Sequence, residues 1–272
     1  MSNKFGSNIS WRKVGIVSAY VALLGLLITL SAFSTQHQNR LKCWKIEVNI
    51  QNEADMLPLM TAEEVMALCN EANSGMVGKL SQEIDIPEIR RYLMIQPYVR
   101  RASVYQTLDG RCQVNIELKK PIAQVIDSSG TMMYIDHEGW TLPMKEGFAA
   151  DVPIFMGQFR TPMLTDPIGM DKRTNYFHQD ILDMAKAIAE NPLWDAQTDQ
   201  MVWSPRAGWT LYPRMGSQVI RFGEAMDFKR KMHNLFVFYS NTLPHIDIEQ
   251  YDTLDARFAN QIVGLKRNYI AL

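Results

Sequence analysis

Residues 101–118 read RASVYQTLDGRCQVNIEL and carry two runs of alternating apolar and polar side chains around one glycine. This alternation is typical of two half-buried β-strands. The apolar residues all have even numbers, and they are Ala102, Val104, Leu108, Cys112, Val114, Ile116 and Leu118. A two-residue turn would oppose even to odd positions, so the connecting loop needs an odd number of residues. Residues 109–111 fit a three-residue loop with a bulge, which places Leu108 opposite Cys112.

The segments before this hairpin complete a small α/β unit. Ile46, Val48 and Ile50 alternate with polar residues and predict a half-buried strand. Thr61 and Glu64 have the spacing of a capping box, and apolar residues follow at helical spacing. Residues 84–94 predict a second helix, with Pro87 in its first turn. The expected order is therefore strand, helix, helix, strand, strand.

The sequence after residue 125 predicts a β-rich domain with flanking helices. Asp180 is expected to cap a helix that ends before Pro192. Its apolar face comprises Ile181, Met184, Ala185 and Ile188. Strands are expected near Met201, at 209–212 and at 218–223. A helix follows, and the residues that line its inner face are Phe228, Met232, Leu235, Phe236 and Tyr239.

A final hairpin closes the chain, with Asn260 and Gln261 as its two-residue turn. The expected pairs are Phe258 with Val263, Ala256 with Leu265, and Asp255 with Lys266, so apolar side chains face each other and acid faces base. The last strand, 262–266, is expected to be an exposed sheet edge. Such an edge can accept a strand from another protein.

The N-terminal segment from Val14 to Phe33 has twenty residues and no charge. At about 1.5 Å per residue it spans a hydrocarbon core of roughly 30 Å, so we expect a transmembrane helix. Basic residues in the stretch 1–13 predict a cytoplasmic tail, with the spacer 34–42 and the remainder outside. The alternative is a signal peptide, but the run is long and lacks a small-x-small cleavage site.

Composition and cysteine spacing narrow the classes of function. The net charge is −1, and the sequence has no basic stripe of the kind that binds nucleic acid. The three cysteines, Cys43, Cys69 and Cys112, are widely spaced, so they form no Cys-x-x-Cys pair. Cys69 and Cys112 fall in phase with apolar positions and are expected to be buried thiols. One bridge between two of the three remains open.

No catalytic residue, metal site or cofactor site is expected from the motifs. The histidines are scattered, and no zinc-protease, nucleophile-elbow, phosphate-loop or dinucleotide motif is present. Asp136 and Glu138 form the best carboxylate pair for an envelope hydrolase acting on peptidoglycan, which we keep as the alternative function. The simpler interpretation is that Asp136 binds backbone N–H groups of a turn at Gly139, with His137 solvated.

Short segments along the chain resemble, in order and spacing, the FtsQ/DivIB family of bacterial cell-division proteins. They are Gly78-Lys79-Leu80, Ile84-Asp85, Pro97-Tyr98-Val99, Ala102-Ser103-Val104, residues 114–117 and 121–123, residues 134–139, Leu142-Pro143 and residues 151–157. The element order resembles that of a POTRA domain. The resemblance implies an α+β fold with one transmembrane helix at 14–33, a POTRA-like α/β domain at 43–125 and a β-rich domain at 126–272.

The resemblance also implies a function. Such proteins are non-enzymatic scaffolds of the inner membrane that bind FtsB-like and FtsL-like division proteins and assist septal peptidoglycan synthesis. Whether the POTRA domain contacts a further division protein stays open. Carried over by position, the partner-binding residues are Tyr251, Leu254, Arg257, Phe258, Ile262, Val263, Gly264 and Leu265. Phe258 stands where the family often has Tyr. The alternative that Phe258 is a core residue of the hairpin stays open. A third interpretation is a POTRA protein of the outer-membrane secretion type. The absence of a long barrel-forming C-terminus argues against it.

Overall fold

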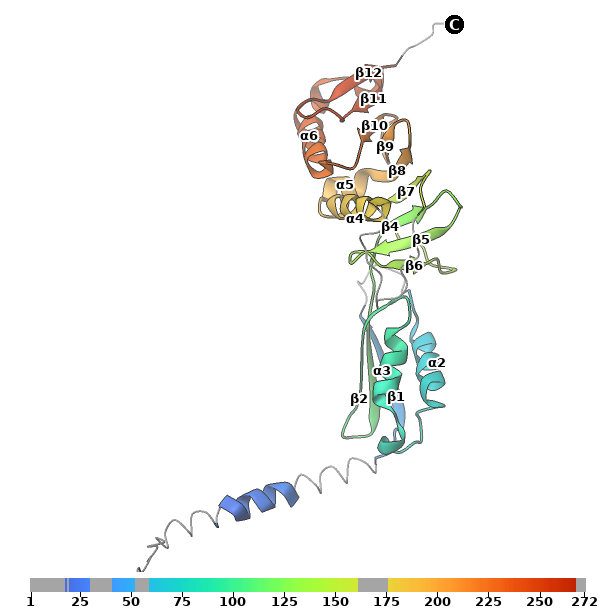
Figure 1. Cartoon of the computed structure of the whole chain (residues 1–272), viewed down its shortest axis with the longest axis vertical. Helices are drawn as coiled ribbons and strands as arrows, with labels where there is room; N and C mark the ends of the chain where they lie inside the picture. The colour runs from blue at the N-terminus through green and yellow to red at the C-terminus, as the bar shows by residue number, and fades with distance from the viewer. Residues whose placement is uncertain (1–17, 19, 30–40, 52–58, 161–175, 268–272) are drawn as a thin grey trace, which may run out of the picture. The chain divides into compact units, whose positions relative to one another are not determined.

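The computed structural model describes residue 18 and residues 20–29, 41–51, 59–160 and 176–267 (Figure 1). The chain divides into two compact units. Among the described residues, the first comprises those up to Gln51 together with Thr61–Met94 and Arg101–Ile116, and the second holds the others. One unit contains a three-stranded sheet and the other a nine-stranded sheet. The expected mixed fold of helices and sheets is therefore confirmed.

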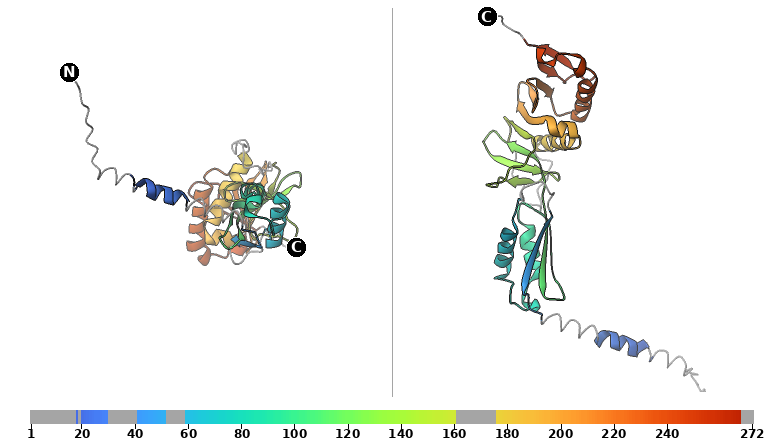
Figure 2. Two further views of the ribbon diagram at one scale, coloured as in Figure 1. Left: turned by 90° about the horizontal axis from the view of Figure 1, so that it is seen from below. Right: turned by 180° about the vertical axis from the view of Figure 1, so that it is seen from behind.

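Two helices pack on one face of the three-stranded sheet in the first unit (Figure 2). The strands, in the spatial order β1-β3-β2, are β1 (Lys45–Gln51), β2 (Val99–Gln106) and β3 (Arg111–Leu118). The helices are α2 (Ala62–Asn73) and α3 (Ile86–Met94), with the short 3-10 helix η1 (Ser81–Glu83) between them. The inward side chains include Val65, Cys69, Ile89, Leu93, Val104, Val114 and Ile116, all buried. The predicted element order is confirmed.

The capping box at the start of α2 is formed as predicted. The backbone N–H of Glu64 donates to Thr61 Oγ1 at 3.2 Å, and the backbone N–H of Thr61 donates to Glu64 Oε2 at 2.8 Å. Two N–H groups that have no partner within the helix are thereby satisfied. The helix ends at Ser74, whose φ of 50° lies in the left-handed region. The chain then turns toward η1.

The hairpin between β2 and β3 has a three-residue loop, but one position earlier than predicted. The N–H of Thr107 donates to the carbonyl of Arg111 at 2.8 Å, and Gly110 N–H donates to the carbonyl of Thr107 at 3.0 Å. Leu108 therefore lies in the loop, where 79% of it is exposed, and its predicted pairing with Cys112 is wrong. An odd loop still keeps the even-numbered side chains on the inner face.

The second unit is built on a mixed sheet of nine strands. Their spatial order is β12-β11-β10-β9-β8-β7-β4-β5-β6. Their bounds are β4 (Pro121–Ile126), β5 (Met132–Asp136), β6 (Thr141–Pro143), β7 (Ile154–Gly157), β8 (Thr198–Ser204), β9 (Gly208–Pro213), β10 (Val219–Gly223), β11 (Tyr251–Asp255) and β12 (Val263–Lys266). The structure places all of β4 in this sheet, across the boundary expected after residue 125.

The second unit also contains three helices, which are α4 (Tyr176–Ala189), α5 (Pro192–Gln197) and α6 (Phe228–Asn241). The four residues predicted for the inner face of α4 are fully buried. Asp180 does not cap this helix, because α4 already includes Tyr176. Asn191 instead caps α5, where its side chain accepts the N–H of Leu193 at 3.0 Å. Phe236 of α6 is 39% exposed, so its predicted inward position is wrong.

Part of the predicted membrane segment falls within the described residues. Residues 20–29 form a helix with exposed side chains. None of the helices in the described residues combines the length and the hydropathy needed to cross a membrane. The expected limits Val14 and Phe33 lie outside the described residues, as does most of the predicted loop 51–60. The transmembrane helix therefore stays a prediction.

Candidate partner-binding strand

The C-terminal hairpin ends the nine-stranded sheet. Strand β11 runs parallel to β10 and antiparallel to β12. On the β12 side the paired residues are Thr253 with Leu265, Leu254 with Gly264, and Asp255 with Val263. Among the described residues, no strand pairs with the other side of β12. The prediction that the final strand is a sheet edge is confirmed (Figure 1).

The register within this hairpin differs from the prediction. Strand β11 ends at Asp255 and residues 256–262 connect it to β12, so the predicted two-residue turn at 260–261 is wrong. Asp255 faces Val263 rather than Lys266. Residues of the connection are held by other contacts, since Arg257 hydrogen-bonds Asp255 and the carbonyl of Ala259 accepts two hydrogen bonds from α6. Ala256 continues the pairing with β10, because its N–H donates to the carbonyl of Arg221 at 2.9 Å.

A charged pair fixes the point where the chain leaves β11. Arg257 Nε donates to Asp255 Oδ1 at 2.9 Å, and its Nη2 donates to Oδ2 at 2.5 Å. The N–H of Arg257 also donates to Oδ1 at 3.1 Å. Burial raises the pKa of Asp255, but these hydrogen bonds outweigh burial and the pKa lies below its ordinary value. An ionised carboxylate therefore holds the guanidinium beside the sheet edge.

Helix α6 holds the connection between the two strands. Arg230 Nη1 and Asn234 Nδ2 both donate to the carbonyl of Ala259, at 2.6 Å and 2.8 Å. Arg230 also pairs with Asp227 at 2.8 Å. Phe258, directly before Ala259, is 44% exposed. The two donors on α6 were missed in the sequence because they face the connection only once α6 lies beside the hairpin.

The far end of the hairpin is packed around Gly264. A Cβ at this position would lie 2.6 Å from Tyr251 Cδ1, so the Tyr251 ring covers the glycine. Arg267 follows β12, and its Nε donates to Asp252 Oδ1 at 2.5 Å while its Nη2 donates to Ser217 Oγ at 2.8 Å. The Arg267 contacts fix the C-terminal end of β12, while its outer side has no strand neighbour in the described chain.

The predicted partner-binding residues separate into two groups in the structure. Leu254 is 1% exposed and belongs to the core, so it supports the sheet and presents nothing to a partner. Ile262 is partly buried and packs against the same core. The residues at the surface or partly so are Tyr251, Arg257, Phe258, Val263, Gly264 and Leu265. Of these, Phe258 and Leu265 are each 44% exposed, so Phe258 is not a core residue.

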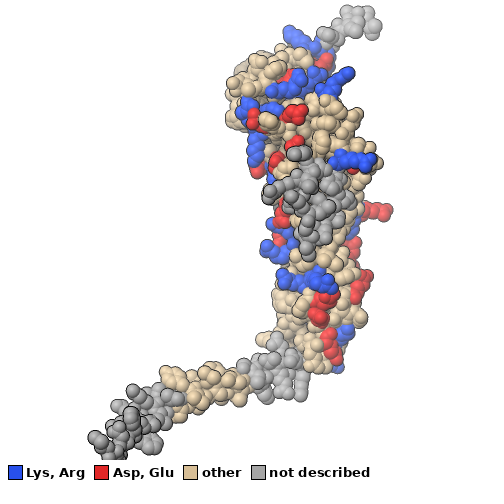
Figure 3. All heavy atoms as spheres, in the orientation of Figure 1, with Lys and Arg blue, Asp and Glu red and all other residues tan. Residues whose placement is uncertain are grey.

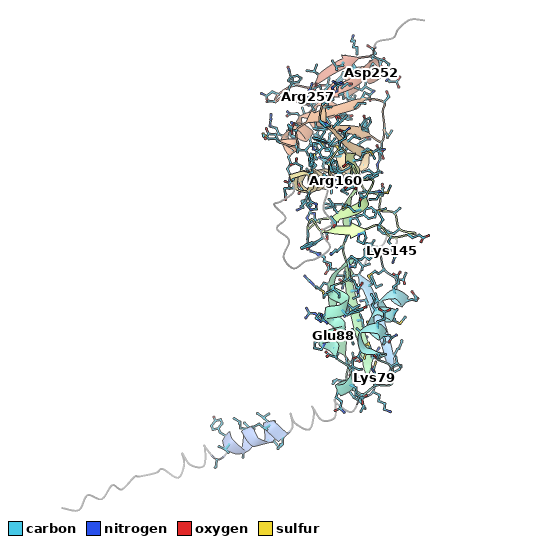
Figure 4. All side chains as sticks on the ribbon, turned by 45° about the vertical axis from the view of Figure 1, so that its right-hand side comes forward. Lys79, Glu88, Lys145, Arg160, Asp252 and Arg257 are labelled. Atoms are coloured by element: carbon cyan, nitrogen blue, oxygen red, sulfur yellow. The ribbon has the colours of Figure 1, made fainter. Side chains whose placement is uncertain are left out.

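Charged side chains lie around this edge. Arg257 and Lys266 are exposed, Arg230 contacts the hairpin connection, and Arg267 directly follows β12. Figure 3 shows Lys and Arg gathered at this end of the second unit, and Figure 4 labels Asp252 and Arg257 there. The three arginines are each paired with an aspartate. Within the described residues, the edge therefore combines main chain without a strand partner, exposed apolar side chains and the exposed cation of Lys266.

Comparison with known proteins gives the family. The model of the family described as FtsQ/DivIB, C-terminal related, matches residues 120–264, and a POTRA-like domain model matches residues 41–118. The chain belongs to the FtsQ/DivIB C-terminal related family. Cell division protein FtsQ of Rhodothermus marinus is 29% identical over 180 residues, which cover 61% of this chain and 60% of that protein. The FtsQ/DivIB resemblance and the POTRA-like domain seen in the sequence are confirmed.

The carboxylate pair of this FtsQ/DivIB-related chain is engaged in a turn and an ion pair. Asp136 is 3% exposed and accepts the N–H groups of Glu138 and Trp140 at 2.9 Å and 2.8 Å. Burial raises its pKa. Glu138 Oε1 lies 2.9 Å from Arg100 Nε. The turn role predicted for Asp136 is confirmed, and no observation favours a peptidoglycan hydrolase.

The three cysteines of the first unit are buried and free. Burial raises the pKa of Cys69 to about 11. Burial, and then a hydrogen bond with Cys43, raise the pKa of Cys112 to about 12. The thiols of Cys69 and Cys112 are therefore protonated at neutral pH and unreactive toward reagents that attack thiolates. The prediction of buried thiols at Cys69 and Cys112 is confirmed.

Proposed function

We propose that this protein is a non-enzymatic, membrane-anchored scaffold of the bacterial division machinery, and that it captures a partner by strand addition to β12. The observation that carries the proposal is the outer position of β12 in the nine-stranded sheet. An outer strand offers main-chain donors and acceptors in a row, and an extended segment of another chain can pair with them. Membership of the FtsQ/DivIB-related family supports the division role.

The side chains around β12 define the kind of segment that fits. Leu265 and Phe258 are each 44% exposed and would supply apolar contact to the added strand. Lys266 is an exposed cation of β12, so an acidic side chain beside it on the partner strand is favoured electrostatically. The partner that the family resemblance suggests is an FtsB-like membrane-anchored protein acting with an FtsL-like protein. Main-chain pairing supplies affinity, and these side chains supply selectivity.

The apolar run 14–33 would serve this capture as an anchor. With the short N-terminal tail in the cytoplasm, both units lie outside the inner membrane, on the side where septal peptidoglycan is made. Two proteins anchored in one membrane meet at a raised effective concentration, so a modest strand pairing suffices for stable assembly. The scaffold thereby helps to bring peptidoglycan synthesis to the septum, and its POTRA-like domain is available to a further division protein.

A charge on β12 tests the proposal. The full chain carrying Val263→Asp, or ending after Asn260, should lose capture of the FtsB-like partner in co-purification from detergent-solubilised membranes. Leu265→Asp serves as a second variant, because its side chain is already 44% exposed and the fold does not depend on burying it. Met132→Asp is the matched control, since Met132 is a 50% exposed residue of β5. Undiminished capture by all three β12 variants would refute strand addition.

A further inference from the structure

Three segments meet at one end of the first unit, which we call the tip: Leu41–Trp44, residues 74–80 and the turn 107–110. The N–H of Cys43 donates to the carbonyl of Lys79 at 2.9 Å, and Trp44 N–H donates to the carbonyl of Gly110 at 3.1 Å. Lys42 forms an isolated bridge with Leu80. Figure 4 labels Lys79 at this end of the unit. Backbone hydrogen bonds therefore join the three segments of the tip to one another.

Each of these segments exposes a large apolar side chain. Trp44 is 58% exposed, Val77 is 61% exposed and Leu108 is 79% exposed. Single exposed apolar residues are normal on a soluble surface, but their convergence from three segments marks an interaction site. The Nε1 of Trp44 donates to the carbonyl of Asp109 at 2.9 Å, which ties the indole to the turn that carries Leu108.

The backbone keeps the tip in this form. Gly110 has a φ of 86°, and a Cβ there would lie 2.6 Å from the carbonyl oxygen of Lys42. Only glycine allows the turn to approach the incoming chain so closely. Gly78 also has a positive φ, of 89°, and its N–H donates to the carbonyl of Cys43 at 2.6 Å. The apolar side chains are thus presented on a preformed support.

We propose that the tip docks into the headgroup region of the membrane in which the chain is anchored, with Trp44, Val77 and Leu108 as the inserted side chains. The inference rests on the anchoring proposed above. Leu41, the first described residue of the tip, lies eight positions after Phe33, the last residue of the apolar run. Eight residues reach at most about 28 Å when fully extended, so anchoring keeps this end of the unit near the bilayer.

The chemistry of the tip fits a lipid surface. Tryptophan concentrates at the boundary between headgroups and acyl chains, because its ring is apolar and its N–H is polar. Exposed Lys42 adds a cation at the same end, where anionic headgroups would attract it. An aromatic and two aliphatic side chains beside a cation form the combination by which peripheral surfaces enter a bilayer interface. Docking would hold the first unit against the membrane.

A spin label on the turn tests this contact in the full chain. The Leu108→Cys variant is reconstituted into vesicles of phosphatidylethanolamine and phosphatidylglycerol and labelled with a nitroxide. The three native cysteines are buried, so the label goes to position 108. Glu63→Cys is the control, because Glu63 is an exposed residue at the other end of α2, away from the tip. Collision rates with oxygen, which concentrates in lipid, and with a water-soluble nickel chelate are then measured.

We expect the label at 108 to collide more with oxygen and less with nickel chelate than the label at 63. A Val77→Asp substitution in the same chain should return the label at 108 to water. Equal collision ratios at both positions in vesicle-bound protein would overturn docking and leave anchoring intact. Failure of the chain to float with the vesicles would overturn both. Shielding seen only in native membranes would indicate a protein neighbour and overturn the lipid assignment.

Discussion

The packing of Tyr251 on Gly264 gives a prediction with a calculable size. Carbon atoms in ordinary contact are about 3.5–4.0 Å apart. A Cβ on residue 264 would lie 2.6 Å from Tyr251 Cδ1 and 2.7 Å from Cε1, so the ring must retreat by about 1 Å in the Gly264→Ala variant. Overpacking of this kind costs about 1–3 kcal/mol. We expect this cost to fall on the pairing of β11 with β12.

Peptide-resolved amide hydrogen exchange measures the loss. Since each 1.36 kcal/mol is a factor of ten, exchange in β11 and β12 should become about 5- to 150-fold faster in Gly264→Ala. The matched test is the same substitution in a Tyr251→Ala background, where no ring opposes the added methyl group. There the extra cost should nearly vanish. An equal effect of Gly264→Ala in both backgrounds would refute the packing and the register of the hairpin.

Three further predictions concern other parts of the chain. Thr61→Ala removes one half of the capping box and should lower the free energy of unfolding of the first unit by about 1 kcal/mol in urea titrations. The pKa of Asp255 is lowered, so its stabilisation is present above about pH 4 and is lost as pH falls through the folded-state pKa. In the Asp255→Asn variant, the free energy of unfolding of the second unit should therefore fall less steeply as the pH is lowered. Native protein should leave Cys43, Cys69 and Cys112 unmodified by iodoacetamide, whereas urea-unfolded protein should react at all three.

Each of these has a contrary outcome. An unchanged urea midpoint in Thr61→Ala would mean that the cap contributes nothing to the first unit. A parallel pH profile for Asp255→Asn would show that the carboxylate is no more stabilised in the folded chain than in the unfolded one. Rapid modification of any cysteine at neutral pH, without denaturant, would contradict its burial.

The first unit was largely predictable because its signals are local. The capping box at Thr61, the helical spacing around Ile89 and the even-numbered strand residues each lie within one element or one hairpin. The error at Leu108 was small. The alternation of apolar residues required an odd number of loop residues but did not fix where the loop begins. That position depends on the hydrogen bonds by which Thr107 and Gly110 close the turn.

The C-terminal hairpin was harder because its register depends on contacts of the connecting segment. Side-chain alternation favoured pairing Asp255 with Lys266, which keeps every apolar residue opposite another. In the structure, hydrogen bonds to Asp255 and from α6 hold Arg257 and Ala259 in the connection, so the residues expected to pair near the turn are not in a strand. The edge position of β12 was still predicted correctly, because it does not depend on the register of the hairpin. Resemblance also named Leu254 as a contact, where burial assigns it to the core.

Amide exchange of β12 with and without the FtsB-like partner tests the central claim most directly. Strand addition creates new main-chain hydrogen bonds on the outer side of Val263–Lys266, so these amides should exchange more slowly in the complex. Protection should be absent at β6, which ends the opposite side of the sheet. A complex that forms with unchanged exchange in β12, and with protection elsewhere, would contradict capture by strand addition.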